Sequence, residues 1–335
     1  MDIHGTCKEH SVIKGLDRFR AALSAAQDAI STKSRMSRGV FRLMCTFIVF
    51  AALLALPKLA SAQQGPTSPL APAPDKSGFT IFDPTPTADL RSFCTDRPTK
   101  STAPCTVDAG HLQFESDLFN VTVDSSGGAT TTTWLLTNPT AKLGLTNTLE
   151  AEINMVPWET VLVRDRATGQ TSRASGVGDL YARLKWNLLG DDGGNIAFAL
   201  SPYVKAPTAN LSIGNGAVEA GLIAPINFNL PMNFSLVVDP ELDLLKNANN
   251  GSRHVNTSGL LSLSRPVSQT VTVSAEIWTD VNFDPGGRTT QVSVDLGAAW
   301  IPSSQPNLQL DGGVNLGLNS CTPGVQAYVG ISRRF

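Results

Sequence analysis

The last twelve residues of the chain, 324–335, constrain its fold more than any other segment. Apolar side chains alternate there with polar or small ones, at Val325, Ala327, Val329 and Ile331, and the chain ends on the apolar side at Phe335. Period two indicates a strand with one apolar and one polar face. A free strand edge promotes aggregation, and a closed barrel removes that edge by pairing the last strand with the first. The segment therefore favours a barrel, although a strand of a soluble sandwich would alternate in the same way.

The composition narrows the choice further. Charged residues make up 16% of the chain, whereas about a quarter is typical of soluble domains. With a net charge of −2, the chain has no overall positive charge that would attract nucleic acid. Beyond residue 62 no run of about 18 apolar residues could form a membrane helix. We therefore predict an all-β protein, an antiparallel transmembrane β-barrel of about twelve strands closed by the strand that ends at Phe335.

Residues 36–62 have the organisation of a secretory signal peptide. Arg38 and Arg42 form a basic start, residues 43–56 are apolar, and small residues at 60–62 offer a cleavage site. The apolar run is too short for a membrane helix. We therefore expect export and a mature chain that begins at Gln63.

The segments on either side of this signal have different expected roles. Residues 1–35 are polar and resemble nothing that follows, so we interpret them as an over-extended start and Met36 as the true one. Residues 63–90 are rich in Pro, Ser, Thr and Ala, which predicts a linker without a core of its own. The whole stretch 63–109 would hang in the periplasm or enter the barrel as a plug. The barrel itself is assigned to 110–335.

Three cysteines remain after the signal peptide is removed. Cys94 and Cys105 lie close together in a turn-rich segment, and an exported protein can form disulfides, so we pair them. The alternative is that all three cysteines stay thiols. Cys321 is outside the pair, and no spacing near the cysteines suits zinc. We expect no metal site.

Three motifs carry a family resemblance. The first is T-D-R-P at 95–98, followed by T-V-D-A-G-H at 106–111 and Q-F-E at 113–115; the others are K-L-G-L-T-N-T-L-E at 142–150 and G-V-G-D-L at 176–180. Together they resemble the MetA-pathway of phenol degradation family, whose members are regarded as outer-membrane transporters. Where that family usually has a basic residue, this chain has Asn147-Thr148. The resemblance covers about 94–335 and implies a barrel and transport. The family name suggests aromatic catabolites, but no residue here identifies a substrate.

Turn signals divide the barrel region into strands independently of the family. The predicted strands are about 111–122, 131–143, 148–162, 177–189, 195–205, 217–229, 232–245, 254–264, 270–282, 290–301, 307–318 and 324–335. Connections at one end should be short, and those at the other end, including 163–176, should be longer.

Aromatic residues should mark the membrane interface at the short-turn end. By parity the predicted girdle faces lipid there, as in other membrane barrels. It consists of Phe114, Trp186, Phe228, Trp300 and Phe335. The same parity places Trp134 and Trp278 inward.

The inward parity collects charged residues, which are costly on a lipid face. The candidate lumen residues are Glu150, Glu152, Asp179, Arg183, Lys185, Glu276, Asp280 and Asp295. They could brace the interior as a structural network, which is the reading we favour. Alternatively, they could line a cation-preferring path, and then removal of Glu150 and Glu152 together should reduce cation selectivity.

No catalytic site is predicted. His254, Asn256 and Ser258 share one strand face, but residues four apart on a strand lie about 13 Å apart, too far for a Ser–His pair. No nucleotide or cofactor motif is present. We therefore predict a channel for small molecules in the bacterial outer membrane and no cofactor. A lipid hydrolase and a structural or adhesive barrel are the alternatives. Expected partners are membrane lipid, small solutes and the barrel-assembly machinery, which would bind the C-terminal strand.

Overall fold

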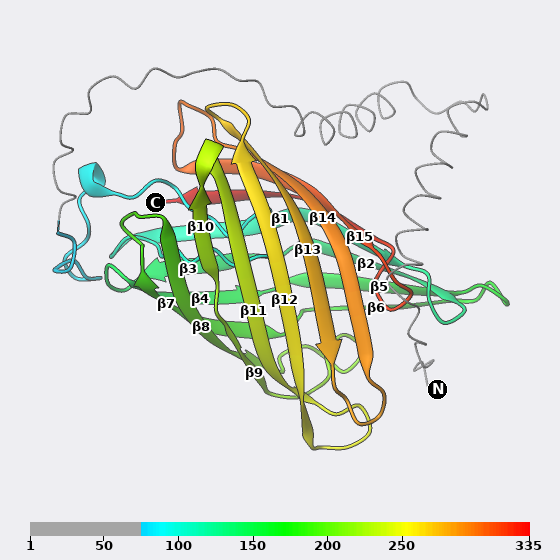
Figure 1. Cartoon of the computed structure of the whole chain (residues 1–335). Coiled ribbons are helices and arrows are strands. Elements are labelled where there is room, and N and C mark those ends of the chain that lie inside the picture. The colour runs from blue at the N-terminus through cyan, green and yellow to red at the C-terminus, as the bar shows by residue number, and fades with distance from the viewer. Residues whose placement is uncertain (1–74) are drawn as a thin grey trace, which may run out of the picture. The chain divides into compact units, whose positions relative to one another are not determined.

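The computed structural model describes residues 75–335, and the strands between residues 112 and 334 form one antiparallel β-sheet that closes into a barrel (Figure 1). Closure comes from β16 (Val325–Arg334), which pairs with β1 (Leu112–Asp124) from Gln113↔Arg334 to Val123↔Val325. The prediction that the last strand closes a barrel on the first is thereby confirmed. The proposed start segment 1–35 and the signal peptide 36–62 lie outside the described residues, as do 63–74. None of the described helices is long and apolar enough to cross a membrane.

Sixteen strand segments form the wall. The remaining ones are β2 (Ala129–Thr137), β3 (Thr140–Gly144), β4 (Leu149–Met155), β5 (Trp158–Asp165), β6 (Thr171–Gly176), β7 (Leu180–Leu189), β8 (Ile196–Ala206), β9 (Glu219–Ile223), β10 (Ile226–Leu230), β11 (Phe234–Lys246), β12 (Arg253–Pro266), β13 (Val271–Asn282), β14 (Thr289–Trp300) and β15 (Leu308–Gly317). Two short 3₁₀ helices are also present: η1 (Thr87–Asp89) precedes β1, and η2 (Pro231–Asn233) lies between β10 and β11.

These segments make twelve spanning strands, because four spanning strands are each interrupted once. The interrupted strands are β2/β3, β4/β5, β6/β7 and β9/β10. The two halves of each one pair with the same neighbouring spanning strand of the barrel. Three of the interruptions contain a proline, at Pro139, Pro157 and Pro225. Proline has no N–H for the ladder, so the strand breaks where it occurs. The predicted number of strands is confirmed.

The two ends of the barrel differ, and we name them by their connections. The turn end carries residues 145–148, 190–195, 231–233, 267–270 and 301–307, and it also holds the entry to β1 and the end of β16. The loop end carries the other connections. Residues 163–176, expected as one long outer loop, are mostly strand instead. β5 and β6 pair up to Arg164↔Thr171, so only 166–170 connect them.

Polar side chains fill the interior and apolar ones face outward, the reverse of a soluble protein. Lys185, Glu150 and Asp295 are among the most deeply buried side chains. Trp186 is 53% exposed and Ile277 57% exposed. An apolar outer band with a polar interior is the pattern of a membrane barrel, and a soluble sandwich would place its apolar face inside. The structure thus resolves the ambiguity that period two left open.

The predicted girdle residues gather near the turn end. Phe114, Trp186, Trp300 and Phe335 are exposed, whereas Phe228 is half-buried. The parity of Trp134 was wrong. This residue is 41% exposed, and its ring lies 5.3 Å from that of Phe119 on the outer surface. Trp134 lies on β2, and the interruption at Asn138 and Pro139 separates it from the inward-facing Lys142 on β3, so the alternation does not continue from one to the other.

A candidate pore and its plug

The residues before β1 dock against the barrel, and we call residues 75–111 the plug segment. Its first part attaches at the turn end, where Ile81 N donates to the carbonyl oxygen of Leu145 over 3.0 Å. Further along, Gly110 N donates to Gly144 O over 2.9 Å. A Cβ at Gly144 would lie 2.2 Å from the carbonyl oxygen of Asp108. The glycine of the K-L-G-L-T motif is therefore required by this close approach of two backbones.

The T-V-D-A-G-H motif connects the plug segment to the end of the chain. Asp108 is fully buried and accepts hydrogen bonds from Arg91 N at 3.1 Å and from Arg334 Nη1 at 3.1 Å. His111 Nδ1 lies 2.9 Å from the carbonyl oxygen of Phe335, and Nε2 lies 2.8 Å from that of Thr85. These contacts hold the plug segment where the first and last strands meet.

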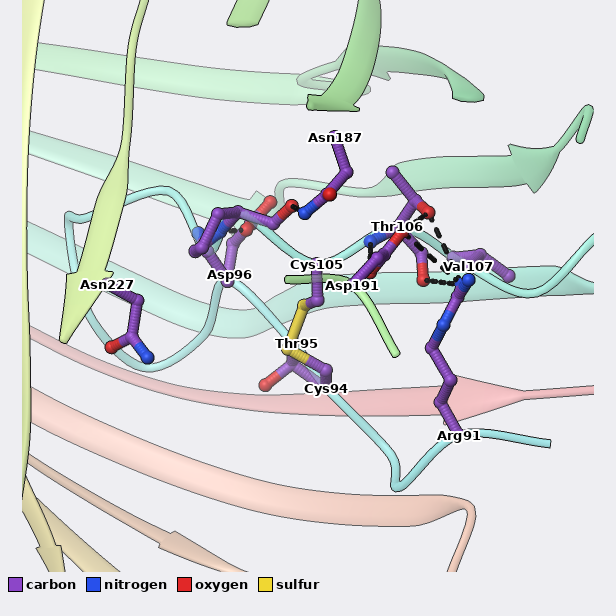
Figure 2. The surroundings of a disulfide bond; sticks show 12 residues. Arg91, Cys94, Thr95, Asp96, Cys105, Thr106, Val107, Asn187, Asp191 and Asn227 are labelled. Atoms are coloured by element: carbon purple, nitrogen blue, oxygen red, sulfur yellow. Dashed lines mark hydrogen bonds and ion pairs between the residues drawn. A yellow bond between two sulfur atoms is a disulfide. The ribbon is translucent and has the colours of Figure 1, made fainter. Parts of the chain in front are cut away.

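A disulfide joins Cys94 and Cys105, whose Cα atoms are 6.6 Å apart (Figure 2). It closes residues 94–105 into a loop, which we call the plug loop. Figure 2 shows Thr106 beside this disulfide with its contacts to Asp191. On the wall, Asn187 donates to the carbonyl oxygen of Pro104 over 2.8 Å. The base of the plug loop is thus fixed to β7 and to the turn after it.

The T-D-R-P motif begins the plug loop directly after Cys94, and its arginine bridges two strands. Arg97 Nη1 lies 2.5 Å from Asp117 on β1, and Nη2 lies 2.7 Å from Asp311 on β15. Tyr328 on β16 donates from its hydroxyl to the carbonyl oxygen of Pro98 over 2.6 Å. Ion pairs of this kind, largely removed from water, hold the plug loop against the β15–β16–β1 wall.

The neighbouring aspartate enters a cluster of buried charges on the adjoining wall. Lys185 on β7 lies 2.9 Å from Glu150 and 3.2 Å from Glu152, both on β4. Asp96 of the plug loop lies 3.3 Å from Lys185 and also contacts Lys142 on β3. Two further ion pairs complete the cluster: Arg183 Nη1 is 2.9 Å from Glu152, and Lys142 Nζ is 2.7 Å from Glu115.

Lys100 fixes the plug loop on a third side. Its ammonium nitrogen lies 3.0 Å from Asp295 on β14, and its backbone N–H donates to Glu276 on β13 over 2.9 Å. The same ammonium lies 4.5 Å from the ring centroid of Trp278, a favourable cation–π distance. Trp278 faces inward, as its parity predicts.

The structure therefore divides the eight candidate lumen residues into three sets. Glu150, Glu152, Arg183 and Lys185 form one cluster with Asp96, and Glu276 and Asp295 share Lys100. The other two lie toward the loop end and apart from the plug loop: Asp179 is 3.2 Å from Lys205, and Asp280 accepts from Asn256 over 2.7 Å. Glu150 and Glu152 are ion-paired, which favours the structural reading of these residues over a cation filter.

The sequence analysis did not select the residues of the plug segment that make these contacts with the wall. It did not select Arg91, Asp96, Arg97, Lys100, Asp108 or Asp191. The available signal was the presence of charged residues in and beside the T-D-R-P motif, because a flexible linker does not need them there. Their partners lie far away in the sequence, so local pattern could not identify them.

Two aspartates at the turn end titrate differently. Burial raises the pKa of the Asp191 carboxyl above its ordinary value, although Arg91 and the hydrogen bonds from Thr106 act in the opposite direction. Burial alone would also raise the pKa of Asp192. Its hydrogen bonds from Arg91 at 2.9 Å and Asn147 at 2.7 Å, with the nearby positive charges, lower that pKa below the ordinary value instead.

A cavity of about 460 Å³ lies between the plug loop and the wall at the turn end. Residues of β10 to β13 line it on one side, and residues of the plug loop line it on the other. Only two lining residues carry a charge, Arg97 and Asp191. This side of the lumen is therefore polar but nearly neutral, in contrast to the charged side formed by β3, β4 and β7.

The three side chains that share one face of β12, His254, Asn256 and Ser258, each contact a different residue. His254 Nδ1 lies 2.9 Å from Asn247, Asn256 donates to Asp243 over 3.0 Å, and Ser258 donates to Glu241 over 3.2 Å. The serine and histidine thus each have another partner. Within residues 75–335, no group of three or more His, Cys, Asp or Glu side chains is arranged to hold a metal ion.

The fold recurs in outer-membrane proteins of known structure. The COG4313 outer membrane channel from Pseudomonas putida F1 is 14% identical, with a TM-score of 0.54, covering 72% of this chain and 100% of that one. The CymD monoaromatic hydrocarbon channel is 10% identical, with a TM-score of 0.38, covering 67% of this chain and 87% of that one. The NanC porin is 9% identical, with a TM-score of 0.43, covering 66% and 98%. A comparison with curated proteins found no match.

The family comparison covers most of the chain. A family described as "Putative MetA-pathway of phenol degradation" matches residues 95–335, from the T-D-R-P motif to the final phenylalanine. That range contains the plug loop and all the strands of the barrel. The resemblance seen in the sequence motifs is confirmed, and this chain belongs to the family of the MetA pathway of phenol degradation.

Proposed function

We propose that this protein is a channel of the bacterial outer membrane that carries small molecules past the plug segment. The observation that supports it most is a closed twelve-strand barrel whose polar interior is partly filled by the plug loop. Twelve strands lie between the roughly eight that fill their own interior and the 16–18 that leave an open aqueous channel. The path is therefore narrow, and the plug loop narrows it further.

The family description supports small aromatic compounds as cargo, because it refers to a phenol-degradation pathway. Catabolism of such compounds in the cell requires their entry, so an outer-membrane channel fits that pathway. The signal-peptide pattern at 36–62 supports a location in the outer membrane, because a barrel must be exported to reach that membrane.

Planar-bilayer recording tests the proposed function. The refolded mature protein, 63–335, should give discrete conductance steps, and a variant that lacks 75–109 should give steps several times larger because the lumen is then empty. A second variant that lacks only 63–74 serves as the control for shortening the chain. A protein that inserts but conducts no ions, with or without 75–109, would refute the channel.

An enzymatic role is disfavoured by the separation of His254 from Ser258. We expect no phospholipid hydrolysis by the refolded protein. Hydrolysis that persists after repurification and disappears in His254→Ala would instead establish the lipid hydrolase.

Assembly through the C-terminal strand is part of the same proposal. Phe335 is exposed at the turn end, where a partner in the membrane could reach it. Deletion of Phe335 should reduce the amount of heat-modifiable protein in the outer-membrane fraction, whereas Phe82→Ala, at an exposed residue of the plug segment, should not. Equal amounts of both variants would argue against recognition of the C-terminal strand.

A further inference from the structure

The cavity beside the plug loop has a wall of hydroxyl groups in register. Ser235 on β11 pairs with Ser264 on β12, and Ser264 pairs with Ser274 on β13. All three residues line the cavity, and we call them the serine row. Directly paired residues on adjacent strands have Cβ atoms about 5 Å apart, so the three serine side chains lie side by side across the wall. Asn229, the partner of Ser235 on β10, extends the row by one amide.

One hydroxyl in this row is unsatisfied. Ser274 Oγ is shielded from solvent and has no hydrogen-bond partner among the described residues. The next strand has Gly297 opposite it, and a Cβ there would lie 2.8 Å from Ser274 Oγ and 2.9 Å from Pro98 of the plug loop. A buried hydroxyl without a partner is unfavourable, so a hydroxyl group of a bound molecule that reaches Ser274 Oγ would restore the missing hydrogen bond.

The cavity offers little to a charged molecule. The Arg97 guanidinium is already bound to Asp117 and Asp311, and the Asp191 carboxyl is bound to Thr106 and Arg91. An ion that entered would lose hydration without gaining a free counter-charge. A neutral molecule exchanges its water for the serine hydroxyls at little net cost.

Apolar surfaces complete the lining. Pro98 and Pro104 of the plug loop, with Val237 and Ile301 of the wall, provide patches that contain no hydrogen-bonding side chain. A ligand with hydroxyls along its edge and C–H surfaces on its faces would match both kinds of lining. The volume of about 460 Å³ falls within the usual range for small-molecule pockets.

We propose that this cavity is a binding site for small, uncharged, hydroxyl-bearing molecules, held by the serine row on the wall opposite the charged cluster. The inference deepens the proposed function, because it identifies which side of the lumen a solute occupies and which class of solute is accepted. It does not require that the molecule pass through the pore.

Saturation-transfer NMR on the refolded mature protein tests the site with three probes of similar size and different charge: glucose, gluconate and protonated glucosamine. Glucose should receive saturation most strongly. Ser264→Leu combined with Ser274→Leu should weaken that binding about tenfold, as expected for two lost hydrogen bonds and a smaller cavity. Ser172→Leu, an exposed position on β6, is the matched control and should leave binding unchanged.

Several results would overturn the site: no saturation of glucose, equal or stronger binding of either charged probe, or full binding by the double variant. Heat-modifiable migration shows whether each variant is folded. The result is separable from channel function. Glucose binding without bilayer conductance would support the binding site and refute the channel. Conductance without glucose binding would support the channel and refute the binding site.

Discussion

Two sides of the lumen are both polar, but their chemistry differs. On the side formed by β3, β4 and β7, Lys142 and Lys185 are buried among carboxylates and reach Asp96 of the plug loop. On the side formed by β10 to β13 at the turn end, serine and asparagine side chains face a cavity. The charged side holds the plug loop, and the neutral side leaves space beside it. The two sides therefore differ in whether their polar groups are charged and ion-paired with the plug loop.

The largest expected effect is on the charged side. Lys185→Met removes the cation shared by Glu150, Glu152 and Asp96, and loss of one partner of a buried ion pair costs about 3–5 kcal/mol. Urea unfolding in micelles, followed by tryptophan fluorescence, would measure the loss in free energy of unfolding. Adding Glu150→Gln should restore part of it. Ser262→Ala on the neutral side is the comparison, with an expected loss below about 1.5 kcal/mol. Similar losses for Lys185→Met and Ser262→Ala would contradict the stated difference between the charged side and the neutral side.

The next effect concerns the disulfide. Replacing Cys94 and Cys105 with serine frees the ends of the plug loop, and closing a loop of this size contributes typically about 2–4 kcal/mol. We expect faster proteolysis within residues 94–105 and noisier, larger conductance steps, while the unfolding of the barrel changes little. Unchanged proteolysis would show that ion pairs alone hold the plug loop.

A smaller effect should depend on pH at the turn end. The pKa of Asp192 is lowered, so its contribution to docking of the plug segment is complete above the ordinary carboxyl pKa, about 3.9, and is lost as the pH falls through the lowered value. Asp191 has a raised pKa and acts in the opposite direction, favouring docking as it becomes protonated. Asp192→Asn should remove the acid-side loss at a cost below about 1 kcal/mol. A fluorophore attached at residue 77 would report the docking; an identical pH profile in the variant would exclude Asp192.

The smallest effect lies on the neutral side, away from the plug segment. Met232 and Asn233 in the turn between β10 and β11 both have positive φ, at 61° and 60°. This conformation costs a residue with a side chain about 1–2 kcal/mol, and glycine adopts it freely. Because glycine also loses more backbone entropy on folding, Met232→Gly should raise the free energy of unfolding by only about 0.5 kcal/mol and leave proteolysis of the plug loop unchanged. A change in that proteolysis would mean that the two sides are coupled.

Local pattern was enough to predict much of the wall. Alternation identified the strands around Glu150 and Lys185 and placed both side chains on the inward face, because parity depends only on residues next to each other in the chain. The same reasoning failed at Trp134, where the predicted strand is interrupted at Asn138 and Pro139, and at 163–176, where a hairpin continues beyond the expected strand ends.

The sequence by itself determined the fold class, the number of strands and the family, because alternation, turn residues and motifs are local. Only the tertiary structure decided which charges are paired. Lys185 meets Glu150 through strand register and Asp96 through the path of the plug loop, and both depend on contacts between residues far apart in the chain. The serine row likewise exists only because three strands align Ser235, Ser264 and Ser274. Periodicity predicts whether a side chain points into or out of the barrel, but only the closed barrel decides which residues it contacts there.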